Sequence, residues 1–159
     1  MAFSRWLQHI PWVESLTGNA VQISIVWLFH FLGFFLVVGT TVFVDLRILG
    51  LAGRRQNLAL LAEQLFPWSW IGLALVVPSG FLMFAGYATQ FYPAGVFRIK
   101  VLAFLLAVVF GIVIQRGVPR WTGSPSLTAS AKVVALISLI LWIGTILASV
   151  EVPAFIPCI

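Results

Sequence analysis

The sequence predicts an all-α integral membrane protein, a four-helix bundle with an N-terminal amphipathic interfacial helix. Two observations support this class. Of the 159 residues, 62% are hydrophobic and only 8% are charged, whereas about a quarter of the residues in a soluble domain are charged. The chain also contains four apolar stretches, each near the roughly 20 residues that a spanning helix requires. We therefore expect a single membrane domain over residues 1–159, surrounded by the lipid bilayer.

The interfacial helix is expected over residues 1–18. Its apolar side chains recur at spacings of three and four, so they share one helical face, while polar and charged side chains take the other. A helix with this pattern lies in the membrane surface and anchors the chain there. Pro11 leaves open an alternative, in which a second short helix begins at that residue.

The four spans are expected over residues 20–44, 66–88, 96–115 and 131–150. The third contains only 15 uncharged residues between Lys100 and Arg116, so it must take Lys100 into its outer turn to reach spanning length. Pro153 is expected to stop the fourth span.

The connections between the spans differ in character. A short interfacial helix is expected within residues 50–63, where polar and leucine residues alternate. Residues 117–130 are rich in Gly, Pro and Ser and are expected to form a turn, and residues 88–97 form a short connection.

The basic residues predict the orientation. Six of them flank the first and third connections: Arg47, Arg54, Arg55, Arg116, Arg120 and Lys132. Because cytoplasmic loops carry the excess of Lys and Arg, we expect these connections in the cytoplasm and both termini in the periplasm or at the cell exterior. The net charge of +5 is thereby explained by topology, and no nucleic-acid partner is expected.

His30 is the most informative residue. It lies about ten residues into the first span, near the bilayer midplane, where ionisable groups usually face a bundle interior. Neutral imidazole is a common axial ligand of haem iron, and Gly33, one turn further on, leaves room for a flat ligand or for another backbone. The alternative is a core histidine bonded to a neighbouring Ser, Thr or backbone carbonyl.

Three more residues are candidates for the same site. Lys100 either snorkels to the headgroups or points inward, where it would pair with an anion such as a haem propionate, with Arg98 assisting. Met83 lies at a depth compatible with a second axial ligand, although a Met in an apolar span also serves as core packing.

A polar pair ends the first span. Asp45 and Arg47 are two residues apart, which places them on different faces of one helix. We expect them to contact other helices or headgroups rather than each other, and a role in proton entry is an alternative for Asp45. No Gly-rich phosphate loop, Cys pair or His-Glu-x-x-His motif is present in the sequence.

Three segments together resemble an uncharacterised family of small four-helix bacterial inner-membrane proteins: HFLGFFLVVGTTVFVDLRILGL, WSWIGLALVVPSGFLMFAGYA and FRIKVLAFLLAVVFG. More distantly, they are similar to the haem-associated group of HemJ-type protoporphyrinogen oxidases and copper-resistance D membrane domains. That resemblance implies b-type haem binding, with His30 and Lys100 as the functional pair. The HemJ-like third helix often ends in a further histidine, where this chain has Gln115 and Arg116, so the resemblance implies haem binding without the oxidase chemistry.

The leading hypothesis is therefore a membrane protein that binds haem b and acts in electron transfer. It would work alone or as the membrane subunit of a redox complex, and if it is an enzyme it is an oxidoreductase or a subunit of one. Two alternatives stay open. One is a cofactor-free structural or assembly subunit that packs against partner chains or its own copies. The other is an oligomeric proton or small-solute conduit that uses His30 and Asp45.

Overall fold

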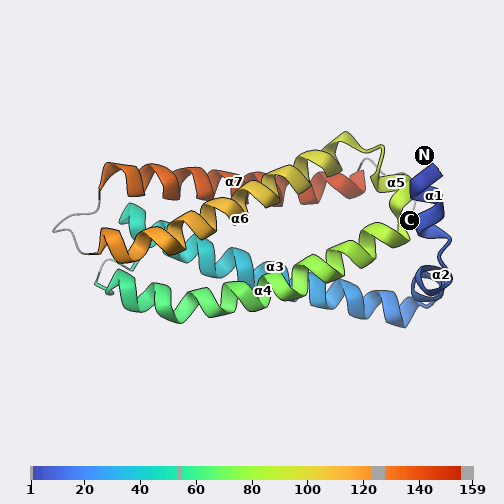
Figure 1. Ribbon diagram of the computed structural model, residues 1–159, viewed down its shortest axis with the longest axis horizontal. Helices are drawn as coiled ribbons and strands as arrows, with labels where there is room; N and C mark the ends of the chain where they lie inside the picture. Colours follow the sequence, from blue (N-terminus) through green and yellow to red (C-terminus); the bar gives the residue numbers. More distant parts are fainter. Residues whose placement is uncertain (1, 54, 123–127, 155–159) are drawn as a thin grey trace.

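The computed structural model describes residues 2–53, 55–122 and 128–154, and within them it contains helices and no strand (Figure 1). The helices are α1 (Ala2–Gln8), α2 (Pro11–Gly18), α3 (Ala20–Leu49), α4 (Leu58–Gly86), α5 (Ala88–Phe91), α6 (Gly95–Trp121) and α7 (Ala129–Ala154). By length and composition, α3, α4, α6 and α7 can each cross a membrane. The predicted all-α, four-helix membrane bundle is confirmed.

The four long helices form an elongated bundle with two different ends (Figure 1). At one end, called the α5 end below, α1, α2 and α5 cover the bundle; at the other, called the loop end, α3 connects to α4 and α6 to α7. The most extensive contacts are those of α3 with α4 and of α6 with α7, and α7 also packs on α3. The bundle therefore consists of two helix pairs, and α3 and α6 run in the same direction.

Three predicted boundaries were wrong. Residues 50–63 contain no separate interfacial helix, because Asn57 caps α4 through a bond from the Ala59 amide and the helix then continues into the span. The expected turn over 117–130 begins later, since α6 extends to Trp121, whose ring packs on Gly117 one turn earlier. Residues 123–127 of that turn lie outside the described part of the chain. α7 ends one residue beyond Pro153.

The N-terminal segment forms two short helices, so the alternative expected from Pro11 is confirmed and a single helix over residues 1–18 is not. Leu7 and Val13 are buried against Ala85 and Ala88 at the α5 end. The three large aromatic side chains of the segment are exposed, as those of a membrane-surface anchor would be; they are Phe3, Trp6 and Trp12.

Two buried clusters hold the helix pairs together. At the loop end, one cluster joins all four long helices: Val44, Ile48, Leu58, Ala62, Ile114, Val118, Ala131 and Ala135. In the middle of the bundle, Val37, Ala107 and Trp142 form the second. Most of the outward surface is apolar, with side chains such as Phe35 and Leu147 more than 60% exposed, which suits a surface that faces lipid.

Candidate functional site

Two glycines bring α3 and α4 into close contact. A Cβ on Gly33 would lie 2.7 Å from the Val76 nitrogen and 2.8 Å from the Gly72 oxygen, and a Cβ on Gly72 would lie 2.7 Å from the Val37 nitrogen. Only residues without a side chain allow two backbones to approach this closely. Of the two alternatives for Gly33, the structure shows the approach of another backbone.

Polar bonds lie on both sides of this glycine crossing. Toward the loop end, the Thr40 and Ser69 hydroxyls are 2.7 Å apart, and toward the α5 end the His30 Nδ1 is 3.1 Å from the Ser79 Oγ. The residues of each helix that make these contacts are separated by three or four positions, which is the spacing of a helix–helix seam. The seam therefore positions His30 on the buried stripe of α3.

The bond to Ser79 fixes how the His30 ring is protonated. The Ser79 hydroxyl lies 2.6 Å from the Leu75 carbonyl, to which it donates its proton, so it can only accept from the imidazole. Nδ1 is then assigned as the protonated nitrogen and Nε2 as the unprotonated one, and the ring has a further hydrogen bond with the Val76 backbone. Metal-ligating histidines have this arrangement, in which the second nitrogen donates to a fixed acceptor.

Gly80 leaves space beside the same ring. A Cβ at this position would come within 3.0 Å of the His30 Cε1 and 3.4 Å of Nδ1. Ser79 and Gly80 were not predicted from the sequence as partners of His30. A signal existed in the small residues Ser69, Gly72 and Ser79, whose spacings of three and seven place them on one face of α4.

Lys100 lies at the same depth as His30. Lys100 lies seven residues before Ala107 of the middle cluster on α6, and His30 lies seven residues before Val37 of that cluster on α3. Because a helix rises about 1.5 Å per residue, both lie about 10 Å from the cluster toward the α5 end. The two residues are close enough for a direct Coulombic interaction. Lys100 is half-buried and, among the side chains that the structure describes, it has no hydrogen bond or ion pair. The structure thus places these two predicted residues at one level of the bundle, on α3 and on α6.

Arg98 does not belong to this group. Its guanidinium donates two hydrogen bonds to the Tyr92 carbonyl, at 3.1 and 3.3 Å, and lies 5.5 Å from the centre of the Tyr92 ring. The side chain is exposed and borders an open hollow of about 300 Å³. Two residues from Lys100, it faces a different side of α6.

Met83 is buried in α4, one turn beyond Ser79 toward the α5 end. The register of the seam places it opposite Val26, which is also buried. Met83 therefore lies in the contact between α3 and α4, near His30 along the helix axis.

A second group of buried polar residues lies nearer the loop end, between α3 and α7. Asp45 is 1% exposed, and Ser138 and Trp142 are equally buried. As expected, Asp45 does not pair with Arg47, whose guanidinium instead donates to the Gln56 carbonyl at 2.7 and 3.0 Å. Asp45 was identified from the sequence, but its neighbour Ser138 was not, because nothing in a single sequence shows that α7 packs on α3.

The fold and these buried groups define a multi-pass membrane protein, a helical bundle with ionisable side chains between its helices. The chain belongs to a family of unknown function (DUF6644), whose family model matches residues 15–152. The matched range includes His30, Asp45 and Lys100, and α1 precedes it. Comparisons with curated proteins and with solved structures gave no match.

Proposed function

We propose that the protein binds one b-type haem at His30, between its two helix pairs, and acts in electron transfer. The observation that carries the proposal is the combination of His30 and Lys100: an imidazole with an unprotonated Nε2 and an ammonium without a described counter-ion, at one depth. An unpaired ammonium inside a membrane bundle is costly. A bound group that carries negative charge and a metal with an open coordination position would satisfy both residues. Haem has both features, because its propionates are anionic and its iron binds imidazole.

The donor set fits this group. The described residues contain no cluster of three His, Cys, Asp or Glu side chains that could hold a bare metal ion, whereas a porphyrin supplies most of the iron ligands itself. His30 would bind the iron through Nε2, Ser79 would hold the ring by its bond to Nδ1, and Lys100 would face the propionates. When bound, the haem supplies the one-electron chemistry, and the helices supply ligation and an apolar surrounding.

The remaining predicted site residues have weaker support. Met83 remains the candidate for a second axial ligand. Arg98 would have to leave Tyr92 to assist the propionates, and Gly33 contributes through the seam that positions His30. Electron transfer, alone or as a subunit of a redox complex, is the role that we assign to the proposed haem. Any enzymatic activity would be that of an oxidoreductase.

We place the protein in a bacterial inner membrane. The excess of Arg and Lys at the loop end supports a cytoplasmic position for that end, with α1, α2 and the His30–Lys100 level toward the periplasm. Cysteine-labelling at Thr128, which is exposed, tests this once the native Cys158 is replaced by Ser: the introduced thiol should resist membrane-impermeant reagents in intact cells. Labelling of this thiol from outside the cell would show that the orientation is the opposite of the one proposed.

The direct test is the visible spectrum of the purified protein, oxidised and reduced, after expression with ample haem. We expect a Soret band that shifts on reduction. The Lys100→Met variant keeps the length of the side chain and removes its charge, so it should bind haem more weakly. The Lys132→Met variant, which changes an exposed lysine, is the matched control. A colourless, well-folded protein would refute the proposal.

A cofactor-free structural subunit is the second candidate, and one observation favours it. His30 already has a hydrogen-bond partner in Ser79, as a purely structural histidine would. This hypothesis predicts a colourless protein that forms defined oligomers, and it assigns no partner to Lys100.

A further inference from the structure

Asp45 is buried where a charge has no compensation. Its side chain is 1% exposed, and both of its neighbours in the apolar loop-end cluster, Val44 and Ile48, are fully buried. Neither carboxyl oxygen has a hydrogen-bond partner in the described part of the chain. An isolated carboxylate in an apolar interior is far costlier than the neutral acid, so such groups take up a proton instead.

The neighbouring helices bring no charge to this carboxyl group. Among the described side chains, the Ser138 hydroxyl of α7 is the polar group that influences the Asp45 carboxyl group, and no charged side chain is close enough to do so. The ionisable residues at this end of α4, α6 and α7 are exposed: Glu63, Arg116, Arg120 and Lys132. On α3 itself, the Arg47 guanidinium is bound to the Gln56 carbonyl.

Two further polar atoms near Asp45 lack partners. The Ser138 hydroxyl and the Trp142 Nε1 are buried without a hydrogen bond to any described residue. Ser138 and Trp142 are four residues apart and so share one face of α7. On α3, Thr41 likewise precedes Asp45 by one turn. The polar groups of the two helices thus follow each other from the loop end toward the middle of the bundle.

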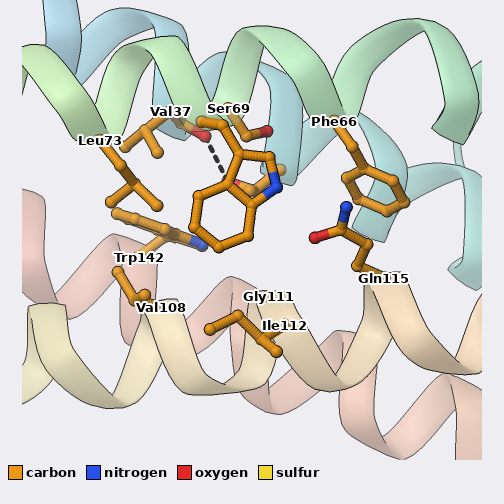
Figure 2. A pocket seen from close by; sticks show the side chains of 11 residues that line it. Val37, Phe66, Ser69, Leu73, Val108, Gly111, Ile112, Gln115 and Trp142 are labelled. Atoms are coloured by element: carbon orange, nitrogen blue, oxygen red, sulfur yellow. Dashed lines mark hydrogen bonds between the residues drawn. The ribbon is translucent and has the colours of Figure 1, made fainter.

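A small cavity adjoins these residues. It encloses about 30 Å³ and is lined by Thr41, Gln115 and Trp142 among others; Figure 2 shows the Trp142 ring and the Gln115 amide beside it. A buried water needs roughly 10–15 Å³ and two or more polar partners. The cavity is partly open and its lining is mostly apolar, and the side chains in that lining that carry polar groups include Thr41, Gln115 and Trp142.

We propose that Asp45 and Ser138 form a proton-binding site between α3 and α7, with a water bound in the adjoining cavity at Trp142. Asp45 holds the proton as a neutral carboxylic acid at neutral pH, and the neighbouring Ser138 hydroxyl, which has no hydrogen bond to any described residue, would accept the hydrogen bond of that acid. The site lies toward the opposite end of the bundle from His30 and Lys100, and it does not depend on haem.

The sequence allows a specific test, because Asp45 is its only aspartate. Protein labelled with carbon-13 at the aspartate side-chain carboxyl is reconstituted in vesicles at pH 7, and its infrared spectrum is compared with that of the unlabelled protein. We expect an isotope-shifted C=O band of a protonated acid, which disappears in the Asp45→Asn variant. An isotope-shifted carboxylate band in its place would overturn the proposal.

A second readout tests the partner and the water. Ser138→Ala removes the hydroxyl and should move the acid C=O band toward the frequency of a free acid; an unchanged band would exclude Ser138 as the partner. Ser149→Ala, whose hydroxyl bonds within α7 to Thr145, should leave the band unchanged. The chain has seven tryptophans, so the Trp142 N–H band is the one that Trp142→Phe removes. With a water at Trp142, that band should lie at a hydrogen-bonded frequency, and the free N–H frequency would contradict a wet cavity.

Discussion

Replacing Gly33 by Ala tests whether the glycine crossing holds the site together. The new Cβ would lie 2.7 Å from the Val76 nitrogen and from the Leu75 Cβ, against an ordinary contact of at least 3.4 Å, so the helices must part by about 0.7 Å. Overpacking of this kind costs about 1–3 kcal/mol. The flanking bonds at His30 and Thr40 would weaken too, each worth roughly 0.6 kcal/mol in a membrane.

The matched control is Gly39→Ala on the same helix, where a Cβ meets nothing within 4 Å. Both variants gain the helix propensity of Ala, about 1 kcal/mol, so that gain cancels between them. We expect Gly33→Ala to be less stable than Gly39→Ala by about 2–4 kcal/mol, measured by unfolding in mixed detergent micelles. Equal stability of the two variants would refute the close-packed seam.

Two other predictions concern the same seam. A double-mutant cycle with Thr40→Val and Ser69→Ala should give a coupling energy of about 0.6 kcal/mol, because each hydroxyl is the partner of the other at 2.7 Å; additive effects would show that the bond contributes nothing. Gly80→Ala would press a methyl group against the His30 ring, so the histidine ring resonances in NMR spectra should shift, and an unchanged spectrum would contradict the contact.

The membrane class of the protein and its four spans could be predicted from the sequence, because they depend on the charge and hydropathy of each segment by itself and not on contacts between segments. His30 was identified by its depth alone, and Lys100 because the third span is too short without it. Helix ends were harder to predict: Asn57 and Trp121 act through a cap and a ring contact that lengthen α4 and α6 beyond their apolar cores.

The contacts between helices could not be predicted from one sequence. That Gly33 meets Gly72, and that His30 meets Ser79, depends on which helices pack together and in which register. The same holds for Asp45 and Ser138, which lie 93 positions apart and meet only because α7 packs on α3. Residue type and depth therefore identified His30 and Asp45 from the sequence, whereas their partners Ser79 and Ser138 became visible only in the folded structure.

The comparison of two histidine variants tests the proposed haem site most directly. His30→Ala removes the proposed ligand, whereas His9→Ala removes the other histidine of the chain, which is exposed and paired with Glu14 at 2.7 Å. Haem content per chain is measured from the Soret absorbance of each purified variant. We predict that His30→Ala loses the band and that His9→Ala retains it; equal haem content in both variants would contradict the assignment of His30 as the ligand.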